Sequence, residues 1–138
     1  MNNETSSHSW AITILRVVVG IVFFVHGWQK VFGMGIHTVA GFFGHAGIPV
    51  PLVSAGIVMA VEFVGGALLI LGVATRFAAG LNAIDMVVAI LAVHLKNGFF
   101  AQSMGFEFPL TLLAACLCLV LAGPGAASVE WLFARRMS

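Results

Sequence analysis

Charge is what this sequence has least of. Asp, Glu, Lys and Arg make up 8% of its 138 residues, whereas 61% are hydrophobic, and the mean hydropathy is +1.10. A water-soluble domain needs far more charged surface than this. The net charge of +1 also excludes the basic surface that nucleic-acid-binding proteins use. We therefore expect the bulk of the chain to lie in a lipid bilayer.

Cysteine is also scarce, with only Cys116 and Cys118. Two residues apart on a helix, they point to nearly opposite sides, so they cannot form a local disulfide or a two-thiol metal clamp. The chain has no CxxC, no CxxCH, no histidine pair at i, i+4 and no GxSxG. These are the usual signatures of thiol exchange, covalent haem, zinc and serine hydrolysis. A haem held between His26 and His94 is disfavoured, and we expect no metal site.

Long apolar runs are what the sequence has instead. About 20 apolar residues cross a hydrocarbon core of roughly 30 Å as a helix. Residues 1–9 are polar and lack the basic start of a signal peptide, so we expect the first run to be retained as a spanning helix. The glycine- and proline-rich stretch 33–51 predicts a short interfacial or re-entrant helix. The predicted spanning helices cover approximately 10–32, 52–72, 76–95 and 107–123.

The chain is thus predicted to be all-α and integral to the membrane, one domain over 1–138 built as a four-helix bundle. Residues 126–138 contain Trp131 and the pair Arg135–Arg136, which predicts an amphipathic tail on the membrane surface. Four spans put both termini on one side, together with most arginines. The positive-inside rule then places both termini in the cytoplasm.

One carboxylate organises the second apolar run. Glu62 is the only charged residue in 52–71, and a charge near the bilayer centre costs about 2.5 kcal/mol or more. We expect it to face a partner or a cavity rather than lipid. Gly65 and Gly66 follow on the same face of the helix, where small residues allow a neighbouring helix to come close. Glu62 is therefore predicted to form part of an internal polar site.

Other ionisable residues interrupt the remaining runs. Arg16 and Lys30 share one stripe of the first helix, with His26 on an adjacent strip. Asp85 lies within the third helix among small residues, and ideal α-helical spacing puts His94 on the opposite side from it. The candidate intramembrane polar site consists of Glu62, Asp85, His26, His94, Glu107, Arg16 and Lys30.

Two interpretations of this set stay open. In the first, the groups handle protons or a quinone: carboxylates and histidines exchange protons, and an apolar slot holds the ring and tail. The slot would be built near the outer surface by His26, Glu107, Phe99, Phe100, Phe106 and Phe108. In the second interpretation, Arg16 and Lys30 form structural ion pairs with Glu62, Asp85 or Glu107.

Six segments, in this order, are similar to a known family and together cover nearly all of the chain. They are HGWQK (26–30), FFGHAGIPVP (42–51), VEFVGGALLILGVATR (61–76), HLKNGFF (94–100), GFEFPLTLLAA (105–115) and GPGAAS (123–128). The chain resembles the DoxX family of small four-helix bacterial membrane proteins. One departure is Phe106, where family members often have Tyr before the Glu, so a hydroxyl donor is lost.

The resemblance implies a multi-pass protein of the bacterial inner membrane. It also implies an accessory or electron-transfer subunit of a membrane oxidoreductase complex, with redox proteins as partners and quinone as the candidate cofactor. The family name comes from subunits associated with a thiosulfate:quinone oxidoreductase. Two alternatives remain: a small-molecule or proton transporter formed by a homo-oligomer, and a structural assembly factor. Fold and family do not decide between them.

Overall fold

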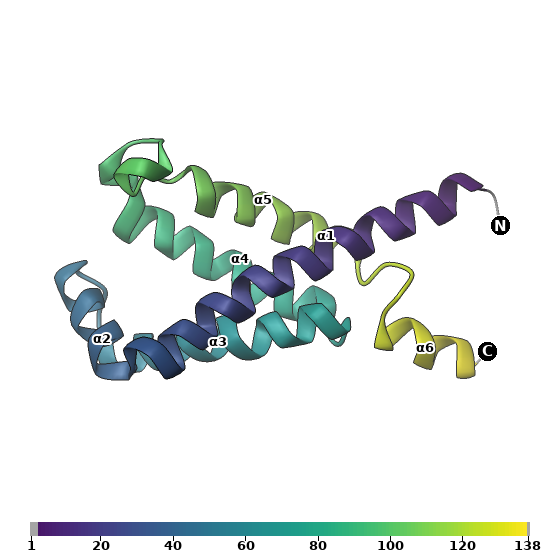
Figure 1. Cartoon of the computed structure of the whole chain (residues 1–138), viewed down its shortest axis with the longest axis horizontal. Coiled ribbons are helices and arrows are strands. Elements are labelled where there is room, and N and C mark those ends of the chain that lie inside the picture. The colour runs from purple at the N-terminus through teal and green to yellow at the C-terminus, as the bar shows by residue number, and fades with distance from the viewer. Residues whose placement is uncertain (1–2, 138) are drawn as a thin grey trace.

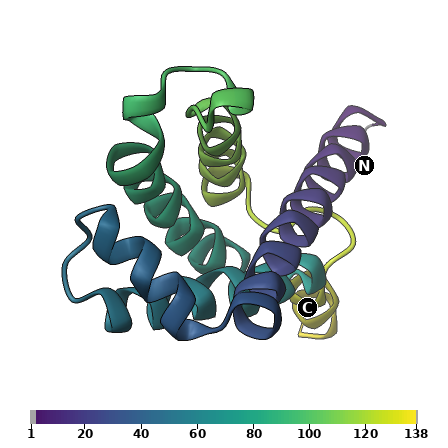
Figure 2. The same ribbon diagram turned by 60° about the vertical axis from the view of Figure 1, so that its left-hand side comes forward.

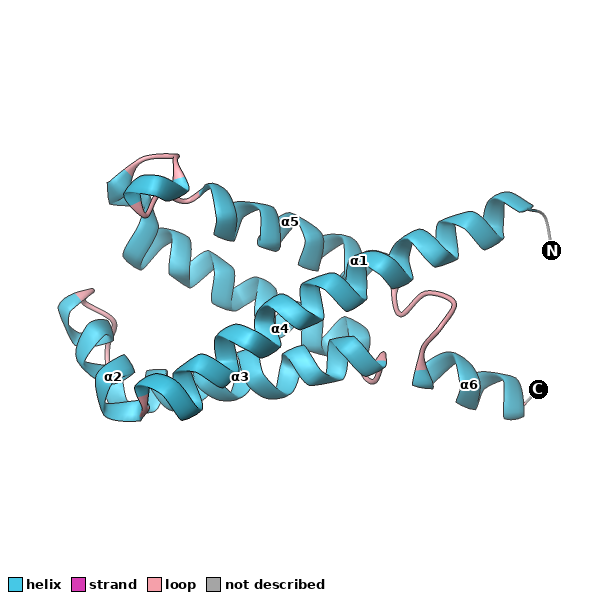
Figure 3. Ribbon diagram, viewed as in Figure 1, coloured by secondary structure: helices cyan, strands magenta, loops and turns pink. Residues whose placement is uncertain are grey.

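The computed structural model describes residues 3–137, and that part of the chain is helical throughout apart from its connections (Figure 3). Two helices are prolonged at their ends by π-helical segments. The elements in chain order are α1 (Asn3–Trp28), the π-helical η1 (Gln29–Met34), α2 (Ile36–His45), α3 (Pro51–Leu71), α4 (Thr75–Ala89), the π-helical η2 (Ile90–His94), the 3₁₀ turns η3 (Leu95–Asn97) and η4 (Ala101–Ser103), α5 (Glu107–Ala122) and α6 (Val129–Arg136).

Three helical stretches are long and apolar enough to cross a membrane: Ser6–Met34, Pro51–Leu71 and Thr75–Asn97. The first helix begins at Asn3, before the predicted start near residue 10, because nothing in the polar residues ahead of the apolar run breaks a helix. α5 is apolar but has 16 residues, which span about 24 Å, less than a typical hydrocarbon core. The fourth span and the interfacial or re-entrant placement of α2 stay predictions.

The helices associate as two pairs. α1 lies along α3, and α4 lies along α5. The pairs diverge toward the end that carries α2 and the α4–α5 connection, as Figures 1 and 2 show. The N-terminus and α6 lie together at the opposite end (Figure 1). In this article the end with α2 is called the open end, and the end with α6 the terminal end.

Glycines allow the backbones of α1 and α3 to touch. A Cβ atom added at Gly66 would lie 2.3 Å from the backbone nitrogen of Phe24, and one at Gly27 would lie 2.4 Å from that of Phe63. Neither position has room for a side chain. The prediction that the glycine face after Glu62 receives a neighbouring helix is confirmed, and small residues at a helix contact are what membrane packing favours.

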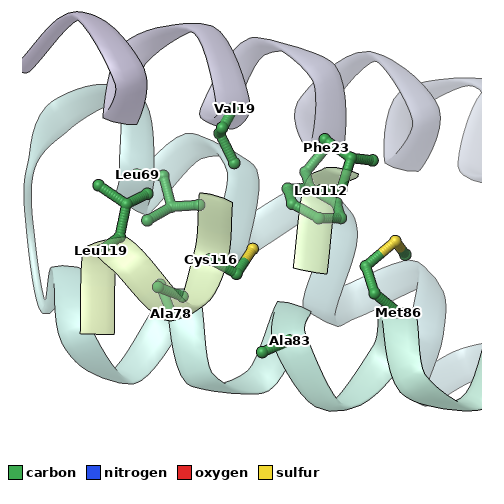
Figure 4. Close-up of a cluster of buried hydrophobic side chains, with 10 residues drawn as sticks. Val19, Phe23, Leu69, Ala78, Ala83, Met86, Leu112, Cys116 and Leu119 are labelled. Carbon is green, nitrogen blue, oxygen red and sulfur yellow. The ribbon is translucent and has the colours of Figure 1, made fainter. Parts of the chain in front are cut away.

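A hydrophobic cluster fills the middle of the bundle, between the two helix pairs (Figure 4). The cluster includes Val19 of α1, Leu69 of α3, and Cys116 and Leu119 of α5. Each of these residues is 4% exposed or less. Cys118 is exposed, so the two cysteines do lie on different sides of their helix. Cys116 acts here as a small packing residue.

At the terminal end, α6 docks against the start of α4. The capping position of α4 is Ala74, whose side chain cannot cap the helix. The carboxylate of Glu130 does so from α6, because its Oε1 accepts the Thr75 N–H at 2.7 Å. The Glu130 N–H in turn donates to the Gly72 carbonyl at 3.1 Å. A carboxylate is favoured at a helix N-terminus by the helix dipole, and only the folded chain brings these residues together.

The tail is helical over Val129–Arg136, a shorter range than the predicted 126–138, whose last residue lies outside the described part. Trp131, Leu132 and Phe133 are exposed on it, at 39–61%. The Ser128 side chain caps this helix by accepting the Trp131 N–H at 3.0 Å. The place of the tail at a membrane surface stays a prediction.

Candidate functional site

A cavity of about 370 Å³ lies between the two helix pairs toward the open end. Its walls come from α1, α2, α3, α4 and α5, and most of them are apolar. Phe23, Phe43, Met86, Phe108 and Leu112 are representative of the lining. Small-molecule sites in proteins are typically apolar hollows of this size with a few convergent polar groups. The ionisable residues of the lining are His26, Lys30, Glu62, Asp85 and His94.

An ion pair joins α1 and α3 inside this cavity. Nζ of Lys30, in η1, donates to Oε2 of Glu62. The Glu62 side chain is 6% exposed and that of Lys30 is 20% exposed. The close contact of α1 and α3 at their glycines brings the two side chains to one level. The pairing confirms that Lys30 neutralises Glu62, one of the options that the sequence left open.

Asp85 of α4 adds a second carboxyl group beside the Lys30–Glu62 ion pair, and these three residues are called the cluster. It interacts electrostatically with both Glu62 and Lys30. Its Oδ2 atom is buried and has no hydrogen-bond partner among the described residues. The cluster thus contains two carboxyl groups and one ammonium group. An excess negative charge in apolar surroundings is costly, so the cluster is suited to taking up a proton or to accepting a hydrogen bond from a ligand.

Asn82, one turn before Asp85, fixes α4 against α3. It is fully buried, and its Nδ2 donates to the Ala78 carbonyl at 3.0 Å and to the Val61 carbonyl at 3.4 Å. A Cβ atom at Gly65 would lie 2.6 Å from this Nδ2. Gly65 therefore makes room for Asn82, which holds Asp85 opposite Glu62. Sequence reasoning did not predict this role of Asn82.

The two histidines border the cavity nearer its opening. His94 Nδ1 lies 2.7 Å from the Met104 carbonyl oxygen, which can only accept, so Nδ1 donates and Nε2 is left for another partner. The ring of His26 on α1 meets that of Phe108 on α5, with centroids 6.1 Å apart. These contacts link the helices on both sides of the cavity to the α4–α5 connection.

The prediction that His94 lies on the opposite side from Asp85 is wrong, since both residues line one cavity. That prediction assumed an unbroken α-helix. The helix changes to π-helical winding over Ile90–His94, and the wider i→i+5 turn rotates each residue less about the axis. Lys30 also lies in a π-helical segment, η1. Such segments are frequent at functional sites.

Two predicted site residues lie elsewhere. Arg16 is 1% exposed and is at the terminal end, where its Nη2 donates to the Ala127 carbonyl and its charge is attracted to Glu130. It does not neutralise Glu62 or Asp85. Glu107 does not line the cavity; its Oε1 accepts the Ala101 N–H at 2.6 Å, which holds the α4–α5 connection in place.

The predicted aromatic slot is also corrected. Phe99 packs edge-on against Phe100 and Phe106 within the α4–α5 connection, and of the predicted slot residues only His26 and Phe108 line the cavity. Sequence reasoning missed Phe42 and Phe43 of α2, which line it instead. The signal was present, because Phe43 continues the apolar helical spacing of Val39 and Ala40.

Within residues 3–137, no three His, Cys, Asp or Glu side chains come together in a group that could hold a metal ion. The cavity instead combines a ring-sized apolar space with proton-exchanging groups on one wall. Its chemistry suits a neutral, largely apolar molecule that carries hydrogen-bonding oxygens.

Known proteins similar to this chain come from bacteria, and two of the three described next are named as membrane proteins. A protein named "Putative oxidoreductase CatD", from Bacillus subtilis, is 39% identical over 110 residues, covering 80% of this chain and 77% of its own. An uncharacterised membrane protein of Mycobacterium tuberculosis is 33% identical, covering 93% and 82%. Inner membrane protein YqjF of Escherichia coli is 28% identical, covering 91% and 93%.

No solved structure matches the chain. The model of the DoxX family matches residues 11–95, which include α2, α3, both π-helical segments and all five ionisable residues of the cavity lining. The match covers more than half of the sequence, and the relatives cover most of the rest. The chain is therefore a membrane protein of the DoxX family.

Proposed function

We propose that this protein binds a quinone in the cavity and serves as the membrane subunit of an oxidoreductase system. The observation that carries the proposal is the cluster of Lys30, Glu62 and Asp85 at the wall of an otherwise apolar cavity. The ammonium group of Lys30 can donate to a quinone carbonyl, and the carboxyl groups can exchange the proton that a quinol oxygen carries. The name of the Bacillus subtilis relative, an oxidoreductase, is consistent with this.

Reduction of a quinone to a quinol takes two electrons and two protons. This chain would supply the binding site and the proton exchange, while a partner redox protein supplies the electrons, because no redox group is implied by its own side chains. His94 and His26, nearer the opening, would connect the cluster with water. The rest of the bundle, closed by the hydrophobic cluster around Leu69 and Leu119, supports a site open at one end more than a transport path.

In this proposal the chain crosses the inner membrane four times. α5 is the fourth span, and the bilayer thins locally around its short length. Both termini lie in the cytoplasm with the arginines of α6. The open end, with α2 at the interface, then faces the exterior. This orientation puts the quinone site in the outer half of the bilayer.

The Asp85→Asn variant separates a functional role of Asp85 from a structural one. Asparagine keeps the shape but removes the second negative charge, so the melting temperature (Tm) should stay the same or rise. Quinone affinity should fall about tenfold, the effect of losing one charge-assisted hydrogen bond. The measurement is a quinone titration and a thermal melt of the purified protein in lipid nanodiscs.

Leu121→Ala is the control for this variant, because Leu121 is 79% exposed on α5 and is not among the residues that line the cavity. It should leave quinone affinity unchanged. A lower Tm for Asp85→Asn with unaltered quinone affinity would show that Asp85 is a structural ion-pair partner. Absence of saturable quinone binding to the unaltered protein would contradict the proposed function itself.

A further inference from the structure

A second cavity, of about 350 Å³, runs between α3 and α4. Its walls are apolar except for Ser54 and Asp85, and Ile57, Val61 and Leu81 are typical of the lining. The hydroxyl of Ser54 already donates to the Pro49 carbonyl at 2.7 Å, so it offers its proton to no ligand. We call this cavity the α3–α4 groove. It is a hydrocarbon-lined space with the carboxyl group of Asp85 at its edge.

The α3–α4 groove adjoins the first cavity, and the two share part of their walls. Phe43, Ile48, Val58, Asp85 and Val88 line both. Asp85 therefore stands at the junction between the polar cluster and the groove. Asp85 has the single hydrogen-bonding side chain among the shared residues, and its Oδ2 has no hydrogen-bond partner within the described part of the chain.

The outer wall of the groove faces the lipid. Ile57 is 58% exposed and Ile84 is 63% exposed, and both belong to helices that are long and apolar enough to span the membrane. Side chains exposed at this depth contact lipid tails, not water. The groove therefore offers a molecule dissolved in the bilayer an approach to Asp85 between α3 and α4.

We infer that the α3–α4 groove holds the hydrocarbon tail of a long-tailed membrane quinone whose ring lies at the Lys30–Glu62–Asp85 cluster. This inference rests on the proposed function and narrows its substrate class from any quinone to a tailed, membrane-dissolved one. Lipid tails are as apolar as the groove, so the groove contributes little driving force. The groove contributes orientation, because the tail departs from the ring in one direction when it lies in the groove.

The test fills the groove and compares two quinones. Leu81→Trp and, independently, Val61→Phe add bulk to side chains that line the groove but not the first cavity. The probes are decylubiquinone and the same benzoquinone ring without its alkyl tail. Each probe is titrated against the unaltered protein and each variant in nanodiscs of one lipid composition. Partition into the bilayer affects the probe equally in every protein and therefore cancels.

We expect each variant to weaken decylubiquinone binding by about tenfold or more, while the tail-less ring binds within about twofold of the unaltered protein. Leu121→Trp, on the lipid face of α5, is the control of matched bulk and should change neither affinity. A thermal melt shows which variants are folded. Two independent positions are substituted so that the test still stands if one variant does not fold.

The outcomes separate the inference from the proposed function. If both quinones bind the unaltered protein and neither filled variant distinguishes them, the groove does not hold the tail, and the quinone site itself stands. The same conclusion follows if both quinones are weakened equally. If neither quinone binds the unaltered protein, the proposed function fails and the inference fails with it.

Discussion

Replacing Lys30 with methionine is expected to lower the free energy of unfolding by about 3 kcal/mol, because removing one partner of a buried ion pair leaves the other charge uncompensated. Glu62 is 6% exposed at its side chain, and Asp85 lies beside it. Without Lys30, two carboxyl groups would face each other with no cation in the cluster. The expected result is a lower Tm and a reduced yield of folded protein in detergent.

Lys96→Met is the matched control, since it removes the same charge from an exposed lysine at the same end of the molecule. It should change the Tm little. The double variant Lys30→Met/Glu62→Gln should recover most of the loss, because the glutamine is neutral. Equal melting temperatures for Lys30→Met and Lys96→Met would show that the ion pair contributes nothing to stability.

Adding one methyl group at Gly66 is expected to separate α1 from α3. In Gly66→Ala, the new Cβ would lie 2.3 Å from a backbone nitrogen of α1, and backbone cannot move aside as the end of a flexible side chain can. Overpacking of this kind costs about 1–3 kcal/mol. Because Lys30 and Glu62 meet across the same helix contact, quinone binding should weaken together with the Tm.

Gly80→Ala provides the comparison for that variant. Gly80 lies in α4, and its nearest neighbour to an added Cβ is a side-chain atom of Val120 at 3.9 Å, an ordinary contact. Alanine is favoured over glycine inside a helix by roughly 0.5–1 kcal/mol, so Gly80→Ala should melt at the same temperature or higher. A Gly66→Ala protein as stable as Gly80→Ala would refute the close contact of α1 and α3.

Much of the fold could be predicted from the sequence, because its strongest signals are local. Apolar runs set the three long helices, the Gly123–Pro124 step ends α5, and Pro51 begins α3. The glycine face after Glu62 indicated a close helix contact. Each of these depends on residues within one turn or one run, where composition and spacing decide the structure.

The parts that could not be predicted depend on contacts between distant segments or on helix winding. The carboxylate of Glu130 caps α4 from 55 residues away along the chain. The π-helical winding over Ile90–His94 brings His94 to the cavity that Asp85 lines. Arg16 shares a stripe with Lys30, yet at the terminal end its Nη2 donates to the carbonyl of Ala127, in the segment ahead of α6. Seven ionisable residues were predicted to form the polar site. Five of them line the cavity, and only the packing shows that Arg16 and Glu107 do not.

The most direct test of the central claim is photolabelling with an azido-quinone in native membranes, followed by mass spectrometry of the labelled peptides. The quinone site predicts label on cavity-lining residues of α1, α2 and α4, around His26, Phe43 and Asp85, that is suppressed by excess unlabelled quinone and weakened by Asp85→Asn. Label spread evenly over lipid-facing positions, and unaffected by competitor or by the variant, would contradict it.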